Sequence, residues 1–155
     1  MSLSASVKSR LQHQHETIHE LLNGFSDELL KQRKHTDKWS VHEQVAHLAA
    51  YQPLFIQRLK RIEQENNPIF ERYVADHDPA FIASCQKPLA ELLQNLQHQR
   101  SLILDYLLAV PDDTLGKTGR HPKYGQLTIV EWTEFFLLHE AHHLFSIFML
   151  TRAIN

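Results

Sequence analysis

Along most of this chain, apolar residues recur every three or four positions, which is the period of an amphipathic α-helix. Four stretches carry the pattern: residues 5–31, 40–64, 88–109 and 128 to about 152. Only four glycines occur in 155 residues, and the six prolines lie mostly between these stretches. No convincing strand pattern is present. The sequence therefore predicts an all-α protein, a four-helix bundle that forms a single domain over residues 1–155.

Two of the predicted helices begin with a recognisable capping signal. Ser40 precedes Glu43 by three positions, and Thr128 precedes Glu131 in the same way. In this spacing the hydroxyl and the carboxylate each accept a hydrogen bond from the other residue's backbone amide. Pro53 falls inside the second helix, where its ring removes one backbone hydrogen bond, so a kink or a break is expected there.

The connections differ in length and composition. Residues 66–87 form the longest crossover, between the second and third helices, and three residue-proline steps interrupt or end it: Asn67-Pro68, Asp78-Pro79 and Lys87-Pro88. Residues 116–127 are rich in glycine, lysine, threonine and proline, which predicts an irregular loop. This loop could present Arg120, His121 or Tyr124 to a substrate, although a plain connection fits the sequence equally well.

The amino-acid composition of the chain excludes several classes of function. The 16 Lys and Arg against 18 Asp and Glu give a net charge of −2, which argues against nucleic acid or an anionic membrane as a partner. A single cysteine, Cys85, excludes a disulfide framework and a multi-cysteine metal site. No apolar run reaches the roughly 18 residues of a membrane span or resembles a signal peptide, so we expect a cytoplasmic protein.

The chain contains 12 histidines, and three of them are expected to face the core. His139 and His143 are four positions apart, so both rings project from one face of the fourth helix, the face that also carries Trp132. His47 lies on the second helix, seven residues after its start. If these two helices are antiparallel, the three rings lie at nearly one level; if they are parallel, an offset of roughly 6 to 12 Å separates them.

A buried histidine is more often a hydrogen-bonded core residue than a metal ligand. Three inward imidazoles at one level, however, would leave polar nitrogens unsatisfied unless they shared a partner. A divalent ion such as Zn²⁺, Ni²⁺ or Fe²⁺ is that partner, and three histidine ligands leave a coordination position open for chemistry. His47, His139 and His143 are therefore candidate metal ligands, whereas the histidines of the first helix are expected to be solvated: His13, His15 and His19.

Residues 139–143 also match H-E-x-x-H, the zinc protease signature in which the glutamate is the general base. Such a protease needs a third ligand downstream and a neighbouring edge strand, and the sequence pattern offers neither. Glu140 is expected at the solvent border of the apolar stripe. Glu140 and Glu43 are candidate catalytic residues that would handle a proton beside the metal.

Three segments carry a family resemblance. They are Trp39-Ser40 with Glu43 and Ala46-His47-Leu48, then His121 through Gly125 with Leu127-Thr128-Ile129, and last His139 through Leu144. On these motifs the chain resembles the DinB-like (YfiT-like) superfamily of metal-binding four-helix bundles. The resemblance implies that His47, His139 and His143 hold a divalent ion. It also implies an up-down-down-up bundle with a long crossover between the second and third helices.

The resemblance implies two broad functions. Family members with a known reaction are thiol-dependent transferases and isomerases or metal-dependent hydrolases. We therefore expect a metal-dependent enzyme, a thiol-dependent transferase or a hydrolase, that acts on a small-molecule substrate with a low-molecular-weight thiol as a candidate partner. The alternative is a non-catalytic, metal-stabilised bundle that binds a small molecule or a partner protein. Exposed apolar helix faces would suit a homodimer.

Overall fold

The computed structural model describes residues 2–154. Four long helical segments and one short hairpin form its framework. The helices are α1 (Ala5–His13), α2 (Thr17–Leu22), α3 (Asp27–Lys31), α4 (Val41–Gln64), α5 (Pro79–Ser84), α6 (Leu89–Ala109) and α7 (Ile129–Ile154). Short 3-10 turns are Gln14–Glu16, Ala75–His77 and Thr114–Gly116, and the strands are β1 (Thr118–His121) and β2 (Gly125–Thr128).

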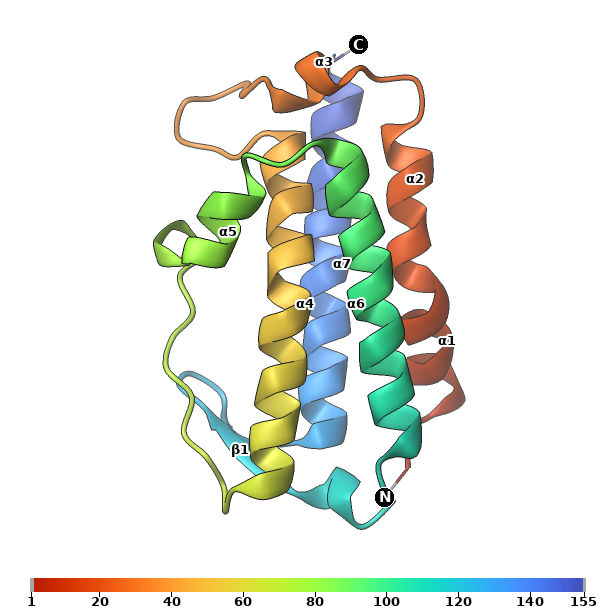
Figure 1. Ribbon diagram of the computed structural model, residues 1–155, viewed down its shortest axis with the longest axis vertical. Coiled ribbons are helices and arrows are strands. Elements are labelled where there is room, and N and C mark those ends of the chain that lie inside the picture. The colour runs from red at the N-terminus through yellow and green to blue at the C-terminus, as the bar shows by residue number, and fades with distance from the viewer. Residues whose placement is uncertain (1, 155) are drawn as a thin grey trace.

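The helices form an up-down-down-up bundle (Figure 1). From the N-terminus, α1 and α2 climb one side; α4 and α6 both descend, and α7 climbs again behind them, packed against α4 and α2. Because α4 and α6 run in the same direction, residues 65–88 must return along the outside of the bundle, and they carry the short helix α5. The predicted four-helix bundle is confirmed, and α4 and α7 are antiparallel.

The predicted helix starts are also observed. Ser40 and Glu43 form a complete capping box at α4, and Thr128 and Glu131 exchange the same pair of hydrogen bonds at the start of α7. Of the kink or break expected at Pro53, the break is absent, since α4 continues through this residue. The cost of about 3 kcal/mol for an interior proline is offset by burial of the flanking Tyr51 and Phe55, each about 1.5–3 kcal/mol.

Two sequence-based expectations were wrong in detail. The first predicted helix is divided into α1, α2 and α3, with an interruption at Gly24, whose φ of +86° is a conformation that favours glycine. Residues 116–127 are not an irregular loop, because β1 and β2 pair as an antiparallel hairpin. Four-residue strands that contain glycine and lack a clear alternation give little sequence signal.

The hairpin is fixed to the lower ends of α4 and α7. A Cβ at Gly119 would lie 2.7 Å from both Ile62 and Phe70, so only glycine lets the strand approach this closely. The indole of Trp132 donates a hydrogen bond to the carbonyl of Gly119 at 3.2 Å. The hairpin therefore has a defined position against the bundle, beside the first turn of α7.

Two apolar clusters fill the bundle. One is built around Phe55, Trp132 and Phe136, and the other around Leu48, Leu92 and Ile147. Buried polar side chains accompany them, including those of His47, Gln52, Arg100, Glu140 and His143. Among the described residues, no helix is both long enough and apolar enough to cross a membrane.

Candidate metal centre

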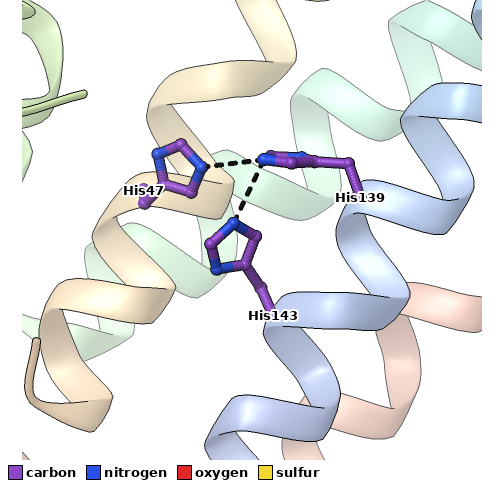
Figure 2. A group of neighbouring side chains, drawn as sticks. All are labelled: His47, His139 and His143. Atoms are coloured by element: carbon purple, nitrogen blue, oxygen red, sulfur yellow. Dashed lines mark hydrogen bonds between the residues drawn. The ribbon is translucent and has the colours of Figure 1, made fainter. Parts of the chain in front are cut away.

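The antiparallel packing of α4 on α7 brings three histidines together (Figure 2). His47 projects from the N-terminal half of α4, and His139 and His143 project toward it from successive turns of α7. The Nε2 atom of His139 lies 3.1 Å from Nε2 of His47 and 3.1 Å from Nε2 of His143. One ring nitrogen from each residue falls within 4.8 Å of the others. The three rings therefore lie at one level of the bundle, as the sequence analysis required for a shared ion.

The site is well shielded from solvent. His47 and His143 are 2% and 9% exposed, and His139 is partly buried. Aromatic rings surround the cluster: Trp39 lies 5.1 Å from the His47 ring, Tyr51 lies 4.6 Å from the His139 ring, and Tyr73 lies 5.9 Å from the His47 ring. Such a low-polarity shell strengthens electrostatic interactions inside it.

The hydrogen-bond partners of the three rings fit a shared cation. Nδ1 of His143 lies 2.6 Å from Oε1 of Gln44; an amide oxygen only accepts, so this nitrogen carries the ring proton and Nε2 presents a lone pair. Nδ1 of His47 and of His139 is buried without a hydrogen-bond partner among residues 2–154. The three Nε2 atoms face one another, and a proton between them can satisfy only some of their lone pairs. Three converging imidazole nitrogens are a donor set for Zn²⁺, Ni²⁺ or Fe²⁺.

The three histidines of the cluster are neutral at physiological pH. Burial, reinforced by the neighbouring imidazoles, lowers the pKa of His47 to about 3 and that of His143 to about 2. Burial likewise lowers the pKa of His139 to about 4, with smaller contributions from His142 and Arg58. Because a metal ion competes with protons for the ring nitrogen, neutral rings are ready to bind it without first losing a proton.

These shifts predict acid sensitivity in the metal-free protein. An unfolded chain protonates its histidines near pH 6.5, but the folded pKa values of His47, His139 and His143 are about 3, 4 and 2. The contribution of these histidines to the free energy of unfolding is therefore fully present above about pH 6.5. Below that pH it falls, by up to about 1.4 kcal/mol per pH unit for each histidine. His15, with a pKa lowered to about 4 by burial first and Arg100 second, adds to the same slope.

Urea unfolding in the presence of a chelator, from about pH 7.5 to about 4.5, measures this slope. The variant His47→Gln should flatten it by about one proton, since one protonation difference between the folded and unfolded states is removed. His13→Gln is the matched control, because His13 is exposed. A slope that is the same in His47→Gln as in the wild type would contradict the prediction.

Sequence analysis did not identify Gln44. It lies one turn before His47 on α4, and nothing in the sequence distinguishes it from the other polar residues of that helix. Its contact with His143 fixes the tautomer that exposes Nε2, as outer hydrogen-bond partners of metal-bound histidines do.

We expect Gln44→Ala to lower the affinity for a divalent ion by about 10–100-fold. Gln44→Glu should retain the affinity, because a carboxylate accepts the same N–H hydrogen bond. Gln64→Ala, at the exposed end of α4, serves as the control. Competition with a chromophoric chelator gives all four dissociation constants, and an unchanged constant in Gln44→Ala would show that the contact has no influence on the metal.

The two candidate catalytic glutamates lie outside this group. Glu43 accepts hydrogen bonds from the Ser40 amide at 2.7 Å and from Arg33 at 2.5 and 2.9 Å. Burial alone would raise the pKa of Glu43, but the hydrogen bonds from Arg33 and Ser40 outweigh it and the pKa is lowered. Its carboxylate thus already has a structural role at the start of α4.

Glu140 was expected at the solvent border, and that expectation was wrong. The side chain is 1% exposed. Its carboxylate pairs with Arg100 of α6 and accepts a second hydrogen bond from Gln14 at 2.9 Å. His15 lies in the same region, 3.4 Å from Arg100, so it is buried rather than solvated. A residue next to His139 in sequence therefore faces different helices.

Open cavities reach the histidine cluster from the hairpin side. His139 lines a cavity of about 590 Å³ together with Tyr51, His121 and Tyr124, and it lines a second cavity of about 630 Å³ with Tyr124 and Leu138. Two of the three hairpin residues that the sequence offered to a substrate thus line these cavities, and Arg120 does not. The arrangement leaves His139 accessible to a small molecule while His47 stays enclosed.

Known proteins resemble this chain in sequence and in fold. The uncharacterized protein YuaE of Bacillus subtilis (strain 168) is 25% identical over 139 residues, which cover 79% of this chain and 83% of YuaE. Among solved structures, Bacillus subtilis YfiT is described as a probable metal-dependent hydrolase with an unusual four-helix bundle topology. It superposes with a TM-score of 0.81 at 20% identity and covers 99% of this chain and 90% of its own.

A second solved structure, the four-helix bundle protein TT2238, gives a TM-score of 0.67 at 20% identity over 92% of this chain and 95% of its own. At these identities the two structures show a shared fold. The sequence profile of the DinB superfamily, in contrast, matches residues 10–147 directly. Because that match spans most of the chain, and the fold and the three-histidine group accompany it, this protein belongs to the DinB superfamily.

Proposed function

We propose that this protein is a divalent-metal-dependent enzyme that acts on a small molecule, with hydrolysis as the favoured reaction and thiol transfer as the second. One observation carries the proposal: three neutral imidazole nitrogens converge within 4.8 Å, and two of the three rings, those of His139 and His143, line open cavities. Three histidine ligands with an open position are typical of catalytic sites rather than structural ones. The fold neighbour YfiT, described as a probable metal-dependent hydrolase, favours hydrolysis over transfer.

His47, His139 and His143 would hold the ion through Nε2, and Gln44 would orient His143. When bound, a divalent ion supplies Lewis-acid chemistry: it lowers the pKa of a water or thiol and polarises an electrophilic carbonyl or phosphoryl group. Trp39, Tyr51 and Tyr73 place aromatic rings around the cluster, which lowers the polarity of its surroundings.

Proton transfer by Glu43 or Glu140 stays a prediction from the sequence. The contacts of both carboxylates, with Arg33 and Ser40 in one case and with Arg100 and Gln14 in the other, favour structural roles. The identity of the metal among zinc, nickel and iron, a homodimer and a cytoplasmic location also stay predictions.

The test combines metal analysis with an activity screen. Purified protein is analysed for bound metal, then assayed against ester, amide and phosphoester substrates and against electrophiles with a low-molecular-weight thiol. Each assay is run with chelator and again after zinc, nickel or iron is restored. Turnover that a chelator removes and one of these ions restores is the expected result. Stoichiometric metal without turnover on any substrate would favour the non-catalytic binding module, and absence of metal binding would refute both.

A further inference from the structure

Arg58 of α4 is a buried cation without an acidic partner. The residue is 7% exposed, and no ion pair within 4 Å joins it to a carboxylate of residues 2–154. Its guanidinium donates one hydrogen bond, from Nη1 to the Tyr51 hydroxyl at 3.1 Å. The rings of Phe70 and Trp132 each lie 5.5 Å from its central carbon. A buried charge normally requires a paired anion, so this arrangement is costly as it stands.

The other fully buried arginine shows how this fold satisfies such a group. Arg100 pairs with Glu140, donates from Nε to Gln52 at 3.1 Å and donates from Nη1 to the carbonyl of Leu11 at 3.3 Å. Its partners all come from the protein. Arg58 has only Tyr51, and a guanidinium has several further N–H donors in a fixed planar fork.

Arg58 also faces a cavity, and the cavity is shared with the candidate metal centre. Both Arg58 and His139 line the space of about 590 Å³ beside the hairpin turn. Three cationic side chains line it, Arg58, Arg72 and Lys123, against one carboxylate, Glu71. The positive balance would concentrate anions there.

Two neutral groups in the same cavity can add hydrogen bonds to an anion. The Tyr51 hydroxyl accepts from Arg58, which leaves its own proton free to donate. Nδ1 of His121 accepts from the backbone amides of Lys123 and Tyr124, both at 3.1 Å, so the proton of the neutral ring sits on Nε2. The hairpin turn thus fixes His121 in the tautomer that donates through Nε2.

We propose that Arg58 is the anchor of an anion-binding subsite, and that the substrate of the metal centre is a small molecule with a carboxylate or phosphate group. The inference rests on the proposed function, since it names a group of the substrate. Tyr51 gives the scale: its ring lies 4.6 Å from the His139 ring, and its hydroxyl touches Arg58. A molecule about as long as one tyrosine side chain would therefore reach from Arg58 to His139. Tyr51, Tyr73, Tyr124 and Phe135 would contact its apolar body.

The experiment is direct binding by isothermal titration calorimetry, with benzoate and phenyl phosphate as anionic probes and benzamide as the neutral one. Full-length wild-type protein, metal-free and metal-loaded, should bind at least one anion more tightly than benzamide. The tighter of the two anions identifies the acidic group as carboxylate or phosphate. Equal binding of the anions and benzamide, or no binding of either anion, would overturn the proposal.

Substitutions on α4 test whether Arg58 itself binds the anion. Arg58→Met should weaken binding of the preferred anion about tenfold or more, the loss expected for hydrogen bonds to a charged group. Its melting temperature without anion should equal or exceed that of the wild type, because an unpaired buried charge is removed. Arg61→Met is the matched control: Arg61 also lies on α4 beside Phe70, with its guanidinium carbon 5.0 Å from the ring, but it is paired with Glu65 at 2.7 Å. Unchanged anion affinity in Arg58→Met, or an equal loss in Arg61→Met, would refute the subsite.

A last variant separates this proposal from the proposed function. His143→Ala should lose metal but keep the affinity of the metal-free wild type for the anion, because Arg58 and Tyr51 are untouched. If the wild type binds no metal, the proposed function fails while anion binding is still measured. If metal binds and the anion does not, only the subsite fails.

Discussion

Replacing His143 with alanine is expected to abolish binding of a divalent ion. The ring of His143 supplies one of the three converging Nε2 atoms, and it is the ring whose tautomer a hydrogen bond to Gln44 sets. Loss of an outer hydrogen bond alone costs about 10–100-fold in metal affinity, so loss of a ligand should exceed that range. Competition with a chromophoric chelator, supported by metal analysis of dialysed protein, measures the effect.

His142→Ala is the matched control for this experiment. His142 is the next residue toward the N-terminus and its ring lies 5.2 Å from that of His143, yet it is exposed and does not belong to the converging group. Its loss should leave the affinity unchanged. Circular dichroism confirms that each variant is folded. Full metal affinity in His143→Ala would contradict the enzyme and the metal-stabilised binding module alike.

The second large effect is expected at Glu140. The change Glu140→Gln leaves the charge of Arg100 buried and uncompensated, since the two side chains are 1% and 2% exposed. Breaking a buried ion pair on one side costs about 3–5 kcal/mol, which is a large part of the stability of a domain of this size. Sequence analysis treated Glu140 as a candidate catalytic residue at the solvent border; the structure predicts instead that Glu140→Gln lowers the stability of the fold. Urea unfolding at neutral pH measures it.

Two comparisons make the Glu140 prediction specific. Glu91→Gln removes a carboxylate from an exposed pair with Lys87, 51% and 42% exposed, and should cost less than about 1 kcal/mol. The double variant Arg100→Met/Glu140→Leu should recover most of the lost stability, because apolar side chains replace both charges. Equal stability of the two glutamine variants would mean that the buried pair contributes nothing, contrary to this prediction.

The two buried arginines, Arg58 and Arg100, differ in how their charges are satisfied. Arg100 and Glu140 neutralise each other on the side of α7 that faces α6 and the first helices. Arg58 stays unpaired on the side that faces the cavity and the histidines. A structural charge is thus satisfied by the protein, whereas the charge beside the candidate metal centre is left for a ligand.

The periodicity of the sequence alone was sufficient to predict the main helices and the helix face that carries His139 and His143. The apolar repeat located α4, α6 and α7, the capping boxes at Ser40 and Thr128 located two helix starts, and the spacing of His139 and His143 placed both rings on the core face. These features are local, because a helix fixes the direction of each side chain relative to its own axis. The meeting with His47 followed once the helices were taken to be antiparallel.

The neighbours that each helix face meets were decided only by the tertiary structure. Glu140 and His139 differ by about 100° around α7, so whether the carboxylate reaches solvent, the metal centre or Arg100 depends on how α6 and α4 pack against that helix. The same holds for Gln44, which meets His143 across a helix interface, and for the hairpin that places His121 beside Arg58 in one cavity. Such contacts join residues far apart in the chain, and their partners are set by the packing of whole helices rather than by any local pattern.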